Sequence, residues 1–251
     1  MIFLGLKGFG DLTILISFLN KCEESHTIII RSGLEQLTKN LLKKKHEVKV
    51  LNVVEDVFPL YSLRRISLKN IYIMILGGIE LRNKINERED LILDCKNTRN
   101  SIFFLGFKKK YLYLNTSIYS GYSKLFGINI NAKILKGSET NILAFPLGST
   151  KDKYFNKRKL IDSCKENNIN LSYVTVILFH SHAAYIKEYK EFNVLIYNDI
   201  AELLELIRKC DAIISVDTFH LHLAVSMQKP LMALGLINHN FIPPYIDECN
   251  K

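Results

Sequence analysis

The feature that most constrains the fold is a regular alternation between short, continuously apolar segments and segments with helical spacing. In the first half of the chain, apolar segments at 1–6, 26–32 and 47–53 alternate with helix-like segments at 12–22 and 34–45. A strand that is apolar at consecutive positions is buried on both faces, which is typical of a parallel sheet covered by helices. The alternation therefore predicts an α/β fold with a doubly wound parallel sheet.

The alternation restarts after a polar stretch at 130–141, which is strand-poor and resembles a linker. The strands expected beyond it, separated by loops and helices, lie at 141–145, 173–179, 192–197, 211–216 and 230–236. This pattern predicts a second open parallel sheet. We therefore expect two Rossmann-like domains, 1–133 and 134–251, which face a cleft where two substrates are brought together and shielded from water.

Composition and cysteine usage narrow the class of protein. The 251 residues are 48% hydrophobic and 24% charged, which is ordinary for a globular protein. No apolar stretch approaches the roughly 20 residues needed to cross a bilayer. The chain starts with neither a basic leader nor a small-residue cleavage site, and its five cysteines are scattered without a C-x-x-C pair. We expect a cytoplasmic protein with reduced thiols.

The net charge is +9, and lysines cluster at 43–45 and 108–110. Such runs are most simply a solvated surface, although they would also attract nucleic acid, a phosphorylated substrate or an anionic membrane face. Aromatic residues do not alternate with the lysine runs, as they do in grooves that bind single strands. We therefore expect no nucleic-acid partner.

Polar residues follow the expected strands of the second sheet. They lie in the segments 148–153, 180–182, 198–199 and 217–222. In open parallel sheets, ligands bind in the loops beyond the carboxyl ends of the strands. The sequence therefore predicts a ligand site at this edge of the sheet.

The stretch KGFGDLT at 7–13 places two glycines, Gly8 and Gly10, between a strand and a helix, where they permit unusual backbone angles and the close approach of a ligand. A dinucleotide fingerprint would need a glycine at Thr13 and an acid at Arg31, so the stretch does not favour a nicotinamide cofactor. Asp11 is expected to begin the helix, either as its cap or as a general base. Spacing alone favours the cap, and the two roles are compatible.

The loop FPLGSTKDK at 145–153 has a composition that suits phosphate. It offers backbone and hydroxyl donors and one point charge, at Gly148, Ser149, Thr150 and Lys153. The Walker frame G-x-x-x-x-G-K is absent. A surface turn is an equally good interpretation of this loop taken alone.

The turn DTFHLH at 217–222 interrupts an apolar run just before a helix. Asp217 and Thr218 either cap that helix or bind a ligand, with Asp217 accepting hydrogen bonds from sugar hydroxyls while backbone amides face a phosphate. Two histidines of this turn and two of the loop at 180–182 suggest a metal site. His220 and His222 are expected to diverge, and neither a carboxylate nor a thiol has metal-motif spacing, so we predict no metal.

Taken together, these stretches resemble the signature of the bacterial lipopolysaccharide heptosyltransferases. CDAIISVDTFHLHLAVSMQKPLMAL at 210–234 is similar to the family's Asp-Thr-Gly segment with a downstream histidine. LKGFGDLTI at 6–14 is similar to its opening G-x-x-GD pattern, and PLGSTKDKYF at 146–155 to the loop that starts its second domain. The match is good for 141–245, fair for 1–20 and poor for about 50–85.

The resemblance implies a GT-B architecture, with an amino-terminal acceptor domain and a carboxy-terminal domain for the sugar nucleotide. It implies metal-independent, inverting transfer of a sugar, with heptose and an ADP-sugar as the family's example, and no cofactor. The implied acceptor is an anionic lipid-linked saccharide of a lipopolysaccharide, O-antigen or related glycan. Such an acceptor also implies peripheral contact with the inner membrane.

The resemblance further implies a role for each matching residue. Asp11, behind Gly8 and Gly10, matches the base that deprotonates the acceptor hydroxyl. The residues that match its phosphate loop, and so would stabilise the leaving diphosphate, are Ser149, Thr150 and Lys153. The residues that match its contacts to the donor sugar and phosphates are Asp217, Thr218 and His222.

Two residues depart from the family's pattern. Phe219 stands where the family has glycine after Asp-Thr, and Phe155 stands where it has tryptophan. Phe219 puts a ring where the backbone normally approaches the diphosphate. The alternative hypothesis is therefore a non-catalytic relative that binds a nucleotide, glycan or partner protein. A sugar-nucleotide epimerase is a further alternative, and it would turn over the donor without an acceptor.

Overall fold

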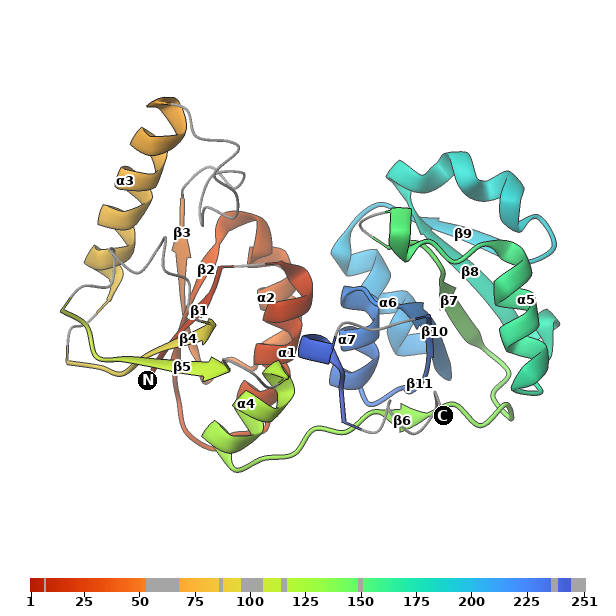
Figure 1. Ribbon diagram of the computed structural model, residues 1–251, viewed down its shortest axis with the longest axis horizontal. Coiled ribbons are helices and arrows are strands. Elements are labelled where there is room, and N and C mark those ends of the chain that lie inside the picture. The colour runs from red at the N-terminus through yellow and green to blue at the C-terminus, as the bar shows by residue number, and fades with distance from the viewer. Residues whose placement is uncertain are drawn as a thin grey trace. The chain divides into compact units, whose positions relative to one another are not determined.

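The computed structural model describes residues 1–6, 8–52, 68–85, 88–95, 106–113, 117–148, 151–235 and 239–244. The chain divides into two compact units, Met1–Ile128 and Asn129–Lys251. Each unit is an open, parallel sheet flanked by helices (Figure 1). The α/β fold with two parallel sheets that the sequence predicts is therefore confirmed.

The sheet of the first unit has the strand order β3-β2-β1-β4-β5, and every pairing is parallel. Its strands are β1 (Ile2–Gly5), β2 (Thr27–Arg31), β3 (Glu47–Leu51), β4 (Leu91–Cys95) and β5 (Lys109–Tyr113). The chain runs outward from β1 to β3 and then returns to the other side of β1 for β4 and β5. The order therefore reverses between β1 and β4.

Four α-helices accompany this sheet: α1 (Phe9–Leu19), α2 (Glu35–Leu41), α3 (Leu68–Lys84) and α4 (Ile118–Phe126), with the 3-10 turn η1 (Ser32–Leu34) before α2. The residues of α1 from Leu12 to Leu19 are all buried, because the helix lies between the sheet and α4. Phe3 of β1 meets Tyr122 and Phe126 of α4, with Phe3 and Phe126 stacked at 5.4 Å between ring centroids, and Phe18 of α1 packs on the same two α4 rings. This aromatic layer forms part of the core of the first unit.

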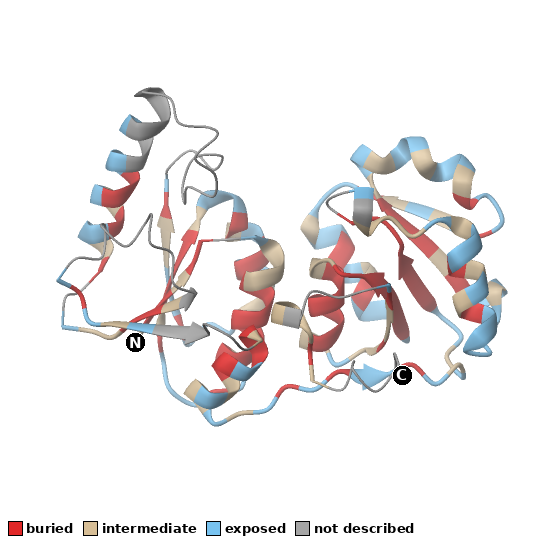
Figure 2. Ribbon diagram, in the orientation of Figure 1, coloured by how far each residue is buried: buried red, intermediate tan, exposed pale blue. Residues whose placement is uncertain are grey.

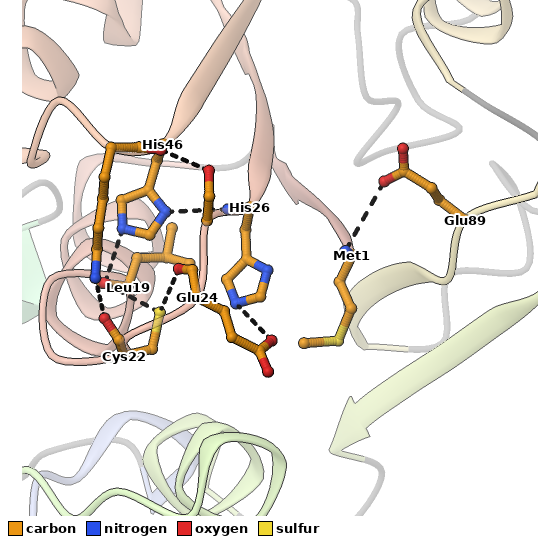
Figure 3. Close-up of polar contacts among 9 residues, drawn as sticks. Met1, Leu19, Cys22, Glu24, His26, His46 and Glu89 are labelled. Carbon is orange, nitrogen blue, oxygen red and sulfur yellow. Dashed lines mark hydrogen bonds and ion pairs between the residues drawn. The ribbon is translucent and has the colours of Figure 1, made fainter.

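A buried histidine joins three elements at the opposite end of this sheet from the α1 turn. His46 precedes β3, and its Nε2 atom lies 2.9 Å from the carbonyl oxygen of Leu19 at the end of α1 (Figure 3). The backbone N–H of His26, just before β2, donates to Nδ1 of His46 at 3.3 Å. Since Nδ1 accepts, Nε2 carries the proton and donates to Leu19, so the neutral ring satisfies both partners.

The sheet of the second unit has the order β6-β11-β10-β7-β8-β9, again with every pairing parallel. Its strands are β6 (Lys133–Ile134), β7 (Ile142–Phe145), β8 (Val174–Phe179), β9 (Asn193–Tyr197), β10 (Ala212–Val216) and β11 (Pro230–Leu234). All residues of the central strands β7 and β10 are buried, as Figure 2 shows. This is why they are continuously apolar apart from Ser215.

The helices of the second unit are α5 (Lys157–Glu166), α6 (Ile200–Lys209) and α7 (Phe219–Ser226). Its 3-10 segments are η4 (Lys151–Lys153), η5 (Leu171–Tyr173), η6 (His180–Tyr189) and η7 (His239–Phe241). Side chains cap two of the helices, since Asn156 accepts from the Lys159 amide at 3.0 Å and Asp199 from the Glu202 amide at 2.9 Å. The polar residues at 198–199 therefore serve the start of α6.

Several sequence-based expectations need correction. The stretch at 130–141, interpreted as a strand-poor linker, contributes the edge strand β6 to the second sheet. The loop expected at 180–182 is the start of the 3-10 segment η6, and α1 begins at Phe9 rather than Asp11. Helices α3 and α4 have no counterpart among the expected elements.

Cys22, Cys164 and Cys210 are buried free thiols.

Candidate functional site

The strongest candidate for a ligand site in the second unit is a lysine–aspartate pair at the carboxyl edge of its sheet. Lys153 ends η4, the segment after β7, and Asp217 directly follows β10. The Nζ atom of Lys153 lies 2.9 Å from Oδ2 of Asp217 and 3.0 Å from its carbonyl oxygen. Asp217 is buried, whereas the lysine side chain is partly open to solvent. The ammonium group of Lys153 is therefore held by Asp217 at the protein surface, at the carboxyl edge of the sheet.

The position of this pair follows from the strand order. From β7 the chain builds β8 and β9 on one side, and then crosses to build β10 and β11 on the other. The loops after β7 and β10 consequently leave the sheet in opposite directions and open a crevice between adjacent strands. Lys153 and Asp217 lie on these two loops, at the topological switch point where doubly wound sheets bind ligands.

Gly148 lets the loop after β7 fold back upon Lys153. A Cβ atom added at Gly148 would lie 2.5 Å from the Cβ atom of Lys153, which is closer than real side chains approach. Glycine is therefore required at 148 for Lys153 to reach Asp217. Ser149 and Thr150, the other residues expected to bind phosphate, lie outside the described residues.

Thr218 is the N-cap residue of α7, but its hydroxyl accepts no hydrogen bond from the backbone amides of the helix. Instead Oγ1 of Thr218 lies 2.9 Å from Nδ1 of His220, and the other ring nitrogen of His220 lies 3.0 Å from the hydroxyl of Tyr197. The imidazole also stacks on Phe145 at 4.2 Å between ring centroids. Residues of β7 and β9 therefore hold the polar turn 217–222 in place, together with contacts within the turn itself.

His220 is electrically neutral at physiological pH. Burial lowers its pKa to about 3, and the nearby charge of His182 acts in the same direction. A neutral imidazole donates from one nitrogen and accepts at the other, which matches its two hydroxyl partners. His220 and Tyr197 were not among the residues predicted for the site. Tyr197 ends an apolar strand, so its sequence position gives no signal of this contact.

His222 lies on another side of α7. Burial lowers its pKa to about 4, a change that Asp217 opposes and Lys153 reinforces, so His222 lies within the electrostatic range of the lysine–aspartate pair. Its ring centroid is 6.3 Å from that of Phe241. His220 and His222 contact different residues, as their spacing predicts. Among the described residues, no three or more His, Cys, Asp or Glu side chains are arranged to hold a metal ion.

Three of the four loops expected to share one edge of the second sheet are in contact. Lys153 joins the loop after β7 to the loop after β10. The hydroxyl of Tyr154 lies 3.4 Å from Nε2 of His182, which joins the first of these loops to η6. Tyr185, also on η6, packs against the Tyr154 ring at 5.4 Å between centroids. The switch point of this sheet therefore has an aromatic wall beside its charged pair.

In the first unit, the predicted residues lie where α1 follows β1, next to the switch between β1 and β4. Asp11 is the third residue of α1, and its Oδ2 atom accepts from the Gly8 amide at 3.4 Å. Asp11 thus supports the start of the helix, as the capping interpretation expects. An acid in the first turn is also favoured by the helix dipole.

The glycines of this turn act differently from what the sequence suggests. Gly8 has φ −93° and ψ 176°, and Gly10 lies within α1, so neither glycine adopts the unusual backbone angles that glycine permits. A Cβ atom added at Gly8 would meet no atom within 4 Å, so the backbone there is open to approach. Thr13, where a dinucleotide fingerprint needs glycine, is buried and donates to the Phe9 carbonyl at 2.8 Å.

Two doubly wound parallel sheets in one chain, with polar residues at the switch points, define an α/β protein of the GT-B class. The Escherichia coli heptosyltransferase WaaC with ADP has this fold, with a TM-score of 0.61 and 13% identity over 97% of this chain and 90% of that one. For a family 9 glycosyl transferase from Veillonella parvula the TM-score is 0.63 and the identity 14%, over 98% of this chain and 84% of that one. E. coli ADP-heptose lps heptosyltransferase II gives 0.57 and 13%, over 97% and 87%.

The family itself is identified from the second unit. Residues 129–250 match the model of glycosyltransferase family 9 (heptosyltransferase), and this part of the chain belongs to that family. The resemblance to heptosyltransferases seen in the sequence is thereby confirmed. No curated protein sequence matches the chain.

Proposed function

We propose that the protein transfers a sugar from a nucleotide-sugar donor to a lipopolysaccharide, an O-antigen or a related surface glycan. The observation that carries the proposal is the Lys153–Asp217 pair at the switch point of a unit that belongs to glycosyltransferase family 9. A lysine at such a point offers a positive charge to a phosphate group. The family supplies the reaction class, and the pair supplies a place for the donor.

The donor proposed is a nucleoside diphosphate sugar, with an ADP-sugar as the first choice and heptose as the first sugar to test. Related E. coli WaaC structures contain ADP and ADP-2-deoxy-2-fluoro heptose. The diphosphate would meet Nζ of Lys153 together with Ser149 and Thr150 of the same loop. Asp217 would then accept hydrogen bonds from sugar hydroxyls, and Thr218 and His222 would complete the donor contacts.

The reaction proposed is a metal-independent displacement with inversion. The carboxylate of Asp11 takes the proton of the acceptor hydroxyl, whose oxygen forms a bond to the anomeric carbon as the bond to the diphosphate breaks. The electron pair of the broken bond stays on the diphosphate, where Lys153 stabilises it. In this scheme residues 1–133 bind the acceptor, with Gly8 and Gly10 beside it, and residues 134–251 bind the donor.

The protein is proposed to act at the cytoplasmic side of the inner membrane, where an anionic lipid-linked saccharide would be its acceptor. Among the described residues, no helix is long and apolar enough to span a bilayer. The net charge of +9 suits an anionic partner. Contact with the membrane in this proposal is therefore peripheral.

The second candidate is a relative that binds a donor or a glycan without catalysis. Phe219, the first residue of α7, favours it, because its ring lies 4.1 Å from that of His220 where the family has glycine. A side chain at this position reduces the space for a diphosphate. Binding without turnover would distinguish this candidate from the transferase.

Calorimetric titration with ADP, UDP, GDP and CMP tests the donor site first. One nucleotide should bind saturably, and Lys153→Ala should weaken it about tenfold or more, since a charged hydrogen bond contributes roughly 1.5–3 kcal/mol. Lys157→Ala is the matched control. Lys157 is 33% exposed and paired with Glu191 at 2.7 Å, much as Lys153 is 35% exposed and paired with Asp217. Absence of binding in folded protein would overturn the donor site.

Turnover is then tested with Asp11→Ala and Asp11→Asn in the presence of the donor that binds. A transferase predicts the loss of sugar transfer with unchanged nucleotide affinity in both variants. Unchanged turnover would exclude Asp11 as the base. Donor turnover in the absence of any acceptor would favour an epimerase instead.

A further inference from the structure

Helix α3 exposes a continuous apolar face. Tyr72, Ile75, Leu76 and Ile79 are 63%, 50%, 45% and 52% exposed. Their spacing, with 3.6 residues per turn, puts all four on one side of the helix over two turns. Figure 2 shows exposed positions on this helix. Single exposed apolar residues are common on protein surfaces, but four adjacent ones form a patch of the kind that marks an interaction site.

The opposite face of α3 is the one that packs on the first sheet. Gly77, Gly78 and Leu81 are buried. Leu81 and Ile85 belong to the core cluster that includes Leu51 of β3. The exposed residues therefore do not face this core, and the helix is apolar on two sides. Packing in the core of the unit accounts for the buried apolar side only.

Cations lie at the carboxyl end of the helix. Arg82 is exposed, and its guanidinium carbon is 5.1 Å from the ring centroid of Phe107. Lys84 pairs with Glu80 at 3.6 Å, one turn away. Lys108, which follows Phe107 in the chain, is 75% exposed and pairs with Asp90 at 3.1 Å. Arg88 is exposed as well. Basic groups thus border the apolar face.

We propose that this face of α3, defined by Tyr72, Ile75, Leu76 and Ile79, docks the protein on an anionic membrane surface. An interfacial helix buries apolar side chains at the boundary between headgroups and acyl chains, while nearby Lys and Arg attract anionic lipids. Tyr72 suits this boundary because its ring is apolar and its hydroxyl remains hydrated. The helix lies along the membrane surface and does not cross it.

A second copy of the chain fits this face less well than a membrane does. Parallel pairing of two copies through α3 would bring Arg82 and its basic neighbours toward the same groups of the partner, which costs free energy. An anionic bilayer neutralises these groups instead. The docking surface depends on the exposure and charge of these side chains and is independent of the transferase activity. Only its use in reaching a lipid-linked acceptor rests on the proposed function.

Flotation with vesicles tests the docking surface directly. Wild-type protein should float with phosphatidylcholine vesicles that contain phosphatidylglycerol, more weakly with phosphatidylcholine alone, and less at high salt. Ile75→Ser combined with Ile79→Ser should lower the partition coefficient about tenfold or more, because two large apolar side chains no longer enter the interface. Arg82→Gln with Arg88→Gln should lower it about fivefold for each charge on anionic vesicles only.

The matched control is Ile186→Ser combined with Leu195→Ser, since these residues of the second unit are 39% and 40% exposed. It should float like the wild type. Thermal unfolding of every variant must match the wild type, which is expected for exposed sites. The proposal is overturned if wild-type protein does not float, if the α3 variant floats unchanged, or if neutral and anionic vesicles bind equally.

Size-exclusion chromatography over a range of concentrations separates docking from self-association. A concentration-dependent dimer that the α3 variant abolishes would assign the face to a second copy and overturn the proposal. A monomer at all concentrations supports the membrane as the partner of the α3 face. Because none of the substitutions touches Lys153 or Asp217, nucleotide titration of the same variants distinguishes failure of docking from failure of the donor site.

Discussion

Nζ of Lys153 lies 2.9 Å from Oδ2 of Asp217 and 3.0 Å from the carbonyl oxygen of the same residue. The two partners differ in exposure, since the lysine side chain is 35% exposed and the aspartate side chain 8%. Loss of either partner leaves the other with a different environment. A lysine released from the pair can be hydrated, whereas a buried carboxylate cannot.

The pair should therefore respond asymmetrically to substitution. We expect Lys153→Ala to lower the free energy of unfolding by about 2–3 kcal/mol, because a buried carboxylate loses its cation. Asp217→Asn should cost about 1 kcal/mol or less, because Lys153 turns toward solvent. Urea unfolding of both variants measures the difference. Equal costs would mean that the exposure of Lys153 does not relieve the loss of its partner.

Gly148 should tolerate no side chain. Gly148→Ala places a Cβ atom 2.5 Å from that of Lys153, so the loop must shift. We expect a loss of about 1–3 kcal/mol in unfolding free energy, as in other overpacked sites, and nucleotide affinity reduced as in Lys153→Ala. Gly8→Ala is the control for stability, because no atom lies within 4 Å of its added Cβ and its φ is −93°. Its unfolding free energy should stay within about 0.5 kcal/mol of the wild type.

The Lys153–Asp217 pair shows which parts of the candidate site can be predicted from the sequence. The loops after β7 and β10 are predictable as ligand loops, because each joins a buried apolar strand to a helix or turn through polar residues. The contact of Lys153 with Asp217 is not predictable in the same way, since it requires β7 and β10 to be neighbours in the sheet. Strand order comes from long-range packing, and the local pattern of residues does not record it.

Two missed elements have physical reasons of the same kind. β6 contains only Lys133 and Ile134, both exposed, and pairs with β11 at the sheet edge. An edge strand needs little burial, so it has no apolar signature. α3 is apolar on its exposed side as well as on its buried side, which removes the periodicity that identifies a surface helix. By contrast, α6 combines buried leucines with exposed charges and was predicted.

Acid should destabilise the second unit through its buried histidines. The pKa values of His220 and His222 are lowered to about 3 and about 4, whereas a histidine in the unfolded chain titrates near 6.5. Below about pH 6.5 the unfolded chain binds protons that the folded protein does not. Stability is therefore full above this pH and falls with further acidification, by up to about 1.4 kcal/mol per pH unit for each histidine.

Chemical unfolding measured from about pH 7.5 to about pH 5 checks this dependence. Asp217 and Lys153 are the charged groups that act on His222, and His182 acts on His220. His222→Gln should flatten the dependence by the share of one histidine, while the exposed His180→Gln should leave it unchanged. A stability that does not depend on pH in this range would show that both rings accept a proton in the folded state.

His46 should contribute to the stability of the first unit through two hydrogen bonds to buried backbone groups. Its ring donates to the carbonyl oxygen of Leu19 at 2.9 Å and accepts from the amide of His26 at 3.3 Å (Figure 3). His46→Ala leaves both backbone groups without this partner in a buried site, so we expect a loss of about 2–4 kcal/mol in unfolding free energy. His46→Phe keeps the volume but not the hydrogen bonds, and should recover only the packing part of the loss. Recovery of full stability by phenylalanine would show that the ring acts by packing alone.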